Sequence, residues 1–354
     1  MNSCSTYGKW ILQGPNEHRS TAAALRLFCI PQAGCGAWSF HGWSSKLPAG
    51  VEVMPVELPG RNSRMAESKD ATSIQQLASE ILDAIEGLLP GDAAEGEAGG
   101  ERGRESRQHN PPYALLGHSM GAWVVYEIAR EIRRRRREEG AATAMPRKLY
   151  VCGNRAPHLS GARNDPDQLS PSIAALPDDR FWACFERRYG ANPDLASPSI
   201  RAYILPLLRA DFRLVESYVC VCGDPLELPI AAVGAEGDSR YLPEQLSRWA
   251  AHCCVPSAIG GRGMGSEQAS GGGDGGGEGE AAAHITGRVN GVVQGQGEGA
   301  GAGAGAGASG FSEHWFTGIS PEQGAEYWGT PHRIVLDYPK ELQEYLAMDL
   351  PTLY

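Results

Sequence analysis

Short apolar runs alternate with segments of helical periodicity along this chain. Five runs are short and apolar enough to form buried strands, and they cover residues 25–30, 51–56, 113–116, 148–152 and 230–233. Between the second and third runs, apolar residues recur at steps of three and four from Ile74 to Leu88, which predicts one apolar helix face. Thr72 and Gln75 form a capping-box pattern at its start. Strands alternating with helices predict the α/β class, with a mostly parallel sheet covered by helices on both faces.

Two stretches interrupt this pattern. Residues 91–110 are rich in glycine and charge, and residues 260–310 include a G-A-G-A-G-A-G-A run. The first stretch has no apolar period and indicates a solvated loop, and the second has too little side chain to offset the entropy lost on ordering, so we expect two disordered or nearly disordered insertions. Without them roughly 280 residues remain, the size of one large domain, which we place at 24–350 after an N-terminal extension at 1–23.

Charge and composition argue against several classes of partner. The net charge of −10 opposes attraction to nucleic acid or to an anionic membrane. The basic run 133–137 is followed at once by Glu138 and Glu139, which indicates a solvated helix end. No apolar run approaches the roughly 20 residues of a membrane span. With nine cysteines, no paired C-x-x-C motifs and no signal-peptide core, we expect a cytoplasmic protein with reduced thiols and no metal site.

The strongest chemical signal is the sequence Gly117-His118-Ser119-Met120-Gly121, between an apolar strand and a segment of helical composition. This context is that of a nucleophile elbow, whereas a bare G-x-S-x-G pattern is common by chance. The two glycines let the strand and the helix approach each other around a strained serine. Ser119 is therefore the candidate nucleophile, and the Met120 N–H at the helix start is placed to stabilise an oxyanion. We expect His118 to point away from the chemistry and to serve packing.

A serine nucleophile needs a base, and the base needs an orienting acid. In hydrolases with this elbow the acid follows the serine in the chain and the histidine comes last. Asp238 is the favoured acid because it lies in the loop after the strand at 230–233, where such sheets keep their site residues. Glu236 and Asp224 are its rivals.

Four histidines follow this acid in the chain. His332 is the favoured base, because it stands in a loop before the closing helix predicted at 339–348. His314 lies inside the predicted final strand at 313–316 and is the alternative, with a surface role for His332 as the remaining possibility. His252 falls in the helix after Asp238 and His284 in the low-complexity tract, so neither is well placed.

Around the first two strands the chain reads L-F-C-I-P-Q-A-G-C-G-A-W and then V-E-L-P-G-R. Together with the G-H-S-M-G elbow, these motifs resemble the type II thioesterase family, the stand-alone α/β-hydrolases that serve fatty-acid, polyketide and non-ribosomal-peptide synthases. The resemblance extends from about residue 25 to 350, interrupted by the insertions. It implies Ser119 as nucleophile, Asp238 as acid and His332 as base, with an oxyanion hole made by the backbone N–H groups of Ala33 and Met120.

One departure from the family pattern concerns the base. The family's histidine normally follows two glycines directly after the last strand, whereas here W-F-T-G is followed by a further stretch and then T-P-H. A catalytic His332 therefore requires that the extra stretch form a loop that returns the histidine to the site.

The resemblance also implies a helical lid, at about 164–222, that shapes an acyl channel. Two amphipathic segments there would place six apolar side chains over the site, although ordinary core helices explain the pattern equally well. These residues are Phe181, Trp182, Phe185, Leu207, Leu208 and Phe212.

The activity implied is hydrolysis of an acyl thioester held on the phosphopantetheine arm of an acyl or peptidyl carrier protein, by a monomer without metal or organic cofactor. A general carboxylesterase or lipase and a non-catalytic binding protein are the alternatives. Carrier proteins in such systems are usually acidic, so docking requires a local basic rim. The candidates for this rim are Arg61, Arg64, Arg155, Arg187 and Arg188.

Overall fold

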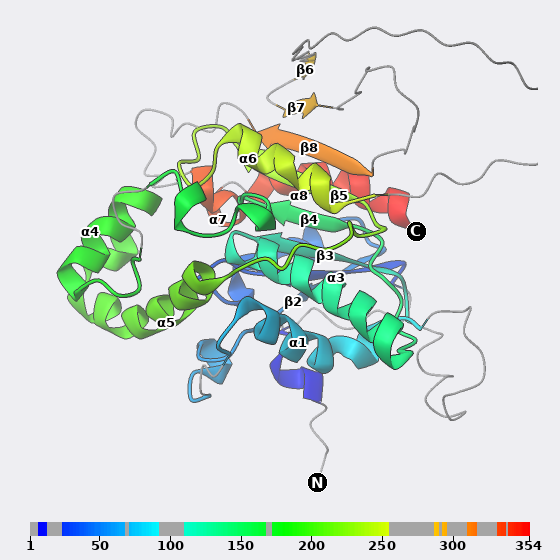
Figure 1. The fold of residues 1–354 in the computed structure, drawn as a ribbon, viewed down its shortest axis with the longest axis horizontal. Helices are drawn as coiled ribbons and strands as arrows, with labels where there is room; N and C mark the ends of the chain where they lie inside the picture. Colours follow the sequence, from blue (N-terminus) through cyan, green and yellow to red (C-terminus); the bar gives the residue numbers. More distant parts are fainter. Residues whose placement is uncertain are drawn as a thin grey trace, which may run out of the picture.

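The computed structural model describes residues 6–12, 23–67, 71–91, 110–167, 172–254, 287–289, 292–295, 310–316, 331–337 and 339–354. Its centre is a mostly parallel sheet with helices on both faces (Figure 1). The strands are β1 (Leu25–Ile30), β2 (Val51–Pro55), β3 (Tyr113–His118), β4 (Leu149–Cys152), β5 (Ile230–Ala235), β6 (Gly287–Val289), β7 (Val292–Gly295) and β8 (Phe311–Phe316).

The strands are arranged in the order β2-β1-β3-β4-β5-β8-β7-β6, and all neighbours from β2 to β8 are parallel. The five predicted strands and the α/β class are confirmed. In the register, Ile30 pairs with Gly117, and Cys152 pairs with His118 and with Val233. The carboxyl ends of β1, β3, β4 and β5 therefore meet at one edge of the sheet, where a parallel sheet keeps its site.

The antiparallel pair β6 and β7 falls inside the 260–310 tract, for which the sequence predicted no regular structure. The prediction is wrong for these two short strands. Valines flank Asn290-Gly291 in the sequence, and a two-residue Asn-Gly pair between β-branched residues is a strong hairpin signal. The rest of this tract, and the 91–110 stretch apart from its two ends, lie outside the described residues.

Helices cover both faces because successive strand residues point to opposite sides. Phe28 and Ile30 of β1 pack in the core with α1 (Ile74–Ile85) and α3 (Met120–Glu139). Leu27 and Cys29 pack in a second core with α7 (Ile334–Asp337) and α8 (Pro339–Asp349). Figure 1 shows α1 and α3 on one side of the sheet and α8 on the other.

The start of α1 lies one residue later than predicted. Ser73, not Thr72, is the N-cap, and its hydroxyl accepts the backbone N–H of Gln76 at 3.1 Å. Gln76 in turn accepts the Thr72 N–H at 3.0 Å, so the reciprocal bonding is shifted by one position. Thr and Ser are both good caps, and sequence alone does not separate neighbouring candidates.

The segment before β1 packs on this framework. It contributes Trp10 and Ile11 to the core, and Ile11 bridges to Val56.

The basic end of α3 is charged surface, where Arg134 pairs with Glu131 at 2.7 Å and is 42% exposed. Within the described residues, none of the helices combines the length and the apolar character needed to span a bilayer.

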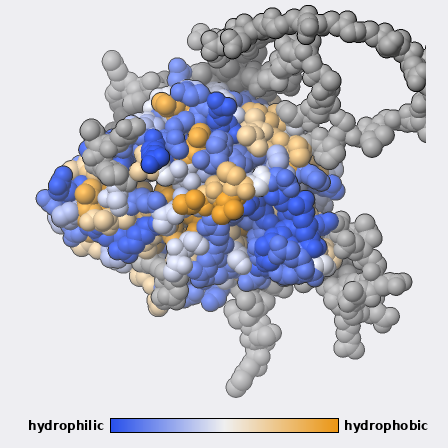
Figure 2. All heavy atoms as spheres, viewed as in Figure 1, coloured by the Kyte–Doolittle hydropathy of each residue, from blue (hydrophilic) through white to orange (hydrophobic). Residues whose placement is uncertain are grey.

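Two helices project from the sheet edge, α4 (Asp178–Tyr189) and α5 (Pro198–Ser217) (Figure 1). They enclose a small core of their own that includes Phe181, Trp182 and Phe212. Figure 2 shows apolar surface at this end of the molecule and in the middle of the same face. In the segment between α5 and β5, Val219 and Val221 are 70% and 68% exposed.

Short helical elements complete the fold. They are α6 (Pro243–Ser247) and the 3-10 turns η1 (Thr6–Lys9), η2 (Ala37–Phe40), η3 (Trp43–Ser45), η4 (Asn62–Arg64), η5 (Glu86–Leu88), η6 (Pro157–Leu159), η7 (Ala162–Asn164), η8 (Pro193–Ala196), η9 (Arg248–His252), η10 (Pro331–Arg333) and η11 (Leu350–Leu353). Of these, η10 bears directly on the site, because it carries His332.

Candidate active site

Ser119 occupies a sharp turn between β3 and α3. Its backbone has φ 52° and ψ −114°, a left-handed conformation that is strained for a residue with a side chain. The flanking glycines make the turn possible. A Cβ at Gly117 would lie 2.0 Å from the Gly121 carbonyl oxygen, and a Cβ at Gly121 would lie 2.3 Å from the Ile30 carbonyl oxygen. The steric reason predicted for both glycines is therefore visible in the structure.

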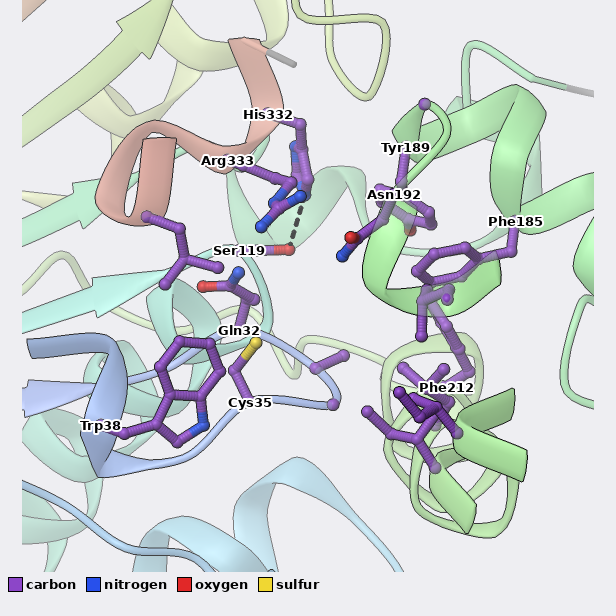
Figure 3. A pocket seen from close by; sticks show the side chains of 18 residues that line it. Gln32, Cys35, Trp38, Ser119, Phe185, Tyr189, Asn192, Phe212, His332 and Arg333 are labelled. Carbon is purple, nitrogen blue, oxygen red and sulfur yellow. Dashed lines mark hydrogen bonds between the residues drawn. The ribbon is translucent and has the colours of Figure 1, made fainter. Parts of the chain in front are cut away.

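Ser119, His332 and Asp238 form one hydrogen-bonded chain. His332 Nε2 lies 3.0 Å from Ser119 Oγ (Figure 3), and His332 Nδ1 lies 2.9 Å from Asp238 Oδ2. The serine comes from the end of β3, the acid follows β5, and the histidine lies in η10. The structure thus brings together the three residues that the sequence selected, although 213 positions separate the serine from the histidine.

The surroundings of Asp238 define the proton positions along this chain. Its side chain is fully buried, and Oδ1 accepts the backbone N–H of Arg240 at 2.8 Å. A carboxylate that faces His332 Nδ1 accepts a hydrogen bond, so the histidine proton sits on Nδ1. Nε2 is then free to accept the proton of the Ser119 hydroxyl, as a general base requires. Burial, and next the charge of Asp238, raise the pKa of Tyr241 well above its ordinary value.

The rival acids lie elsewhere. Glu236 is exposed, and the side chain of Asp224 is 83% exposed beside Arg137 of α3.

The alternative histidines have other contacts. His314 lies in β8, as predicted, with its ring 4.0 Å from that of Tyr345 in the second core. His252 is bonded to Tyr126 and His158. His284 lies outside the described residues.

A cavity of about 230 Å³ opens onto Ser119 and His332 (Figure 3). Of the six apolar side chains expected over the site, Phe185, Leu208 and Phe212 line it. Phe181, Trp182 and Leu207 are buried but do not line it. The wall opposite α4 and α5 follows β1 and was not predicted from sequence, apart from Ala33. It consists of Gln32, Ala33, Gly34, Cys35 and Trp38.

Comparison with known proteins identifies the family. The family model for the thioesterase domain matches residues 25–93 and 101–256. This chain belongs to the thioesterase family. It is 34% identical to the gramicidin S biosynthesis protein GrsT of Aneurinibacillus migulanus, over 70% of this chain and 83% of that protein. It is 30% identical to the thioesterase PikA5 of Streptomyces venezuelae, over 71% of this chain and 77% of that protein.

Solved structures agree with the assignment. The RedJ thioesterase of the prodiginine pathway of Streptomyces coelicolor is 34% identical and superposes with a TM-score of 0.52, over 66% of this chain and 78% of that one. ClbQ of the colibactin pathway, 16% identical, shares the fold with a TM-score of 0.59, over 94% of this chain and 98% of that one. The α/β-hydrolase fold and the activity class, hydrolysis of thioesters, follow from this membership.

The family match ends at residue 256, before the residues of β8 and η10. The position of His332 therefore depends on the geometry given above and not on the family match. The gap between β8 and η10 contains the extra stretch noted in the sequence, which lies outside the described residues.

In this thioesterase the loop after β1 is fastened to helix α5. Asp211 of α5 is buried and accepts both the Gly34 N–H, at 2.7 Å, and a short charged hydrogen bond from Arg61 Nη2. A Cβ at Gly34 would lie 2.3 Å from Leu208, so α5 packs directly on this loop. Arg61 is the arginine of the E-L-P-G-R motif, and the contact supplies a structural reason for it. Sequence reasoning missed Asp211, because nothing local marks it as the partner of a residue 150 positions away.

Two backbone N–H groups are expected in the oxyanion hole, those of Ala33 and Met120. Ala33 lines the cavity and Met120 is the first residue of α3. Neither N–H donates to a protein acceptor within the described part of the chain. The hydrogen bond from Gly34 to Asp211 holds the peptide that follows Ala33.

The basic rim predicted for partner docking is largely wrong. Four of the five arginines are buried, with exposed fractions between 3% for Arg64 and 6% for Arg155 and Arg188. Arg61 pairs with Asp211, and Arg188 with Asp167. Only Arg187 among the five has an exposed side chain, at 46%, and it too contacts Asp167. The sequence shows charge but not burial, and a buried arginine with a partner serves the interior.

Proposed function

We propose that this thioesterase hydrolyses acyl thioesters carried on the phosphopantetheine arm of an acyl or peptidyl carrier protein, with Ser119, His332 and Asp238 as its catalytic residues. The observation that carries the proposal is the hydrogen-bonded chain of these residues at the floor of an apolar cavity. The relatives support the substrate class, since GrsT is named for gramicidin S biosynthesis and RedJ for the prodiginine pathway.

The first half of the reaction forms an acyl-enzyme. His332 Nε2 takes the Ser119 proton as Oγ attacks the thioester carbonyl, and the oxygen of that carbonyl becomes an oxyanion. His332, now protonated, gives its proton to the departing thiolate as the carbon–sulfur bond breaks. Buried Asp238 stabilises the imidazolium without itself becoming protonated. The products are an acyl ester on Ser119 and the free thiol of the arm.

The second half releases the acid. His332 removes a proton from water, the resulting hydroxide attacks the acyl ester, and Ser119 Oγ leaves with the proton that His332 returns. The Ala33 and Met120 N–H groups stabilise both oxyanions, and each donor contributes about 2.7–4 kcal/mol. Every proton therefore moves between the substrate, water and groups of this chain.

The cavity favours an acyl chain over a polar group. Phenylalanine and leucine side chains from α4 and α5 form one wall, and they limit water around the ester on Ser119. Trp38, 53% exposed, and Ile200, 43% exposed, line the cavity as well as facing solvent. We place the entry of the arm beside these two residues.

The test is turnover of a panel of acyl-carrier substrates by wild type and by Ser119→Ala. We expect wild type to release free acid from at least one acyl-carrier substrate. The rate for Ser119→Ala should be lower by a factor of about 10³ or more. Ser45→Ala, which changes an exposed serine outside the cavity lining, is the matched control and should retain full activity.

Each substrate is paired with its oxygen ester. Faster cleavage of the ester than of the thioester would indicate a carboxylesterase. A wild type that neither turns over any substrate nor reacts with a fluorophosphonate probe would indicate a binding protein.

A further inference from the structure

His118, the residue before the nucleophile, is fully buried and yet makes two polar contacts that packing does not require. Its Nδ1 lies 2.6 Å from the side-chain amide of Gln32, and its Nε2 lies 2.7 Å from the backbone oxygen of His332. It thus joins the loop after β1, the elbow and η10, three segments that are far apart in the sequence.

The direction of the two hydrogen bonds follows from their partners. The His332 carbonyl only accepts, so His118 Nε2–H is the donor. Burial, and next the charge of His332, lower the pKa of His118 to about 3, so the ring is neutral at neutral pH and Nδ1 is an acceptor. Gln32 must then present its amide nitrogen to Nδ1. The identity of the two ends of a glutamine amide follows from their hydrogen-bond partners, and the end beside His118 is therefore the NH2 group.

The contact with His332 matters because of how that residue is supported. Besides Ser119, the described residues give His332 two hydrogen-bonded anchors, Asp238 at the ring and His118 at the backbone. Asp238 fixes the direction of the ring but holds only its Nδ1 side. The backbone bond from His118 fixes how far the whole residue sits from the elbow, because His118 and Ser119 are consecutive.

We propose that His118 is a positioning residue that sets the distance between His332 Nε2 and Ser119 Oγ. Its second nitrogen holds Gln32, and with it the loop that carries Ala33. The inference rests on the catalytic roles proposed above for Ser119 and His332. His118 itself touches neither substrate nor reacting atoms. It acts through the backbone of the base on one side and through the loop that carries the Ala33 N–H on the other.

The test compares His118→Gln with His118→Met. The two side chains have nearly the same length, but only Gln can place an amide N–H where His118 Nε2 stands. His118→Asn is the third variant, because its amide reaches the Nδ1 position and not the His332 carbonyl. The assays are steady-state hydrolysis of the hexanoyl thioester of N-acetylcysteamine, the rate of Ser119 labelling by a fluorophosphonate, and the thermal midpoint.

We expect His118→Met and His118→Asn to lower kcat about 10- to 100-fold, since a displacement of about 1 Å can cost 10²-fold. KM should stay within about twofold and labelling should slow in parallel, because both reactions need the same base. His118→Gln should recover most of kcat and of the labelling rate. A purely structural role would instead lower the thermal midpoint of all three variants and leave the kcat of the folded fraction unchanged.

The proposal is overturned if Met and Gln variants have equal kcat, or if KM rather than kcat changes. Should His118→Met fail to fold, the comparison of Asn with Gln decides the question in the same way. Labelling also separates this proposal from the proposed function. A wild type that reacts with the probe but not with the thioester contradicts the substrate assignment, while the order of labelling rates still tests His118.

Discussion

The buried ion pair between Arg61 and Asp211 allows a stability prediction that depends on the placement of α5. The side chains are 5% and 6% exposed, and Asp211 also accepts the Gly34 N–H. The perturbation is Asp211→Asn, which keeps the size of the side chain and an oxygen for Gly34 but removes the charge.

The expected cost follows from what Arg61 retains. Within the described residues its remaining hydrogen-bond acceptor is the Pro59 carbonyl, and its Nε has none. Breaking a buried pair by removing one partner costs about 3–5 kcal/mol, because the other charge is left uncompensated. The exposed pair of Lys340 with Glu344, at 3.9 Å on α8, is the control, and Glu344→Gln should cost less than about 0.5 kcal/mol.

The assay is urea unfolding followed by tryptophan fluorescence, with the double variant Arg61→Met/Asp211→Asn completing a cycle. The double variant removes both charges, so we expect it to be more stable than Asp211→Asn alone. A loss below about 1 kcal/mol for Asp211→Asn, or a double variant less stable than either single one, would refute the reasoning. In either case α5 would not be fastened to the loop after β1 by this pair.

Three further predictions follow from the geometry of the site and core. Gly117→Ala places a methyl group 2.0 Å from a backbone oxygen and should abolish soluble, folded protein, whereas Gly223→Ala, which meets no atom within 4 Å, should not change the thermal midpoint. Asp238→Asn should lower kcat by about 10⁴-fold, because the amide oxygen keeps the Arg240 N–H and the NH2 group then faces Nδ1 of His332, which favours the wrong tautomer; a variant within tenfold of wild type would exclude Asp238 as the acid. Burial lowers the pKa of His252 from 6.5 to about 4. Between pH 6.5 and pH 4 the unfolded chain therefore binds a proton at this histidine that the folded chain does not bind. The free energy of unfolding should therefore fall as pH is lowered from 6.5 to 4, and His252→Phe should make the urea midpoint depend less on pH over that range.

The parts of the fold that sequence predicts are those with local patterns. Buried strands are short apolar runs, and the elbow is five consecutive residues whose glycines have a steric reason at Ile30 and Gly121. Asp238 and His332 can be predicted from sequence because the chain order of the residues and their position relative to predicted strands restrict the candidates for acid and base. The structure places both in one hydrogen-bonded chain with Ser119, and their catalytic roles are proposals.

The parts that sequence missed depend on which distant residues meet. The burial of Arg64, which stacks 3.7 Å above the Trp10 ring, is invisible in a linear pattern. The partner of Arg61 is Asp211 on α5, a helix whose sequence pattern predicts only an apolar face. The sequence predicts that His118 points away from the chemistry and packs, and it offers no reason for a hydrogen bond there. The structure gives one, in the backbone of a residue 214 positions away.

The most direct test of the account is to identify the acylated residue by mass spectrometry after wild-type enzyme is mixed with an acyl-carrier thioester and quenched in acid. The account predicts that the acyl mass appears on the peptide containing Ser119, before free acid accumulates, and is absent from Ser119→Ala. Turnover that proceeds with no acyl group on Ser119, or with the acyl group on another residue, would contradict it.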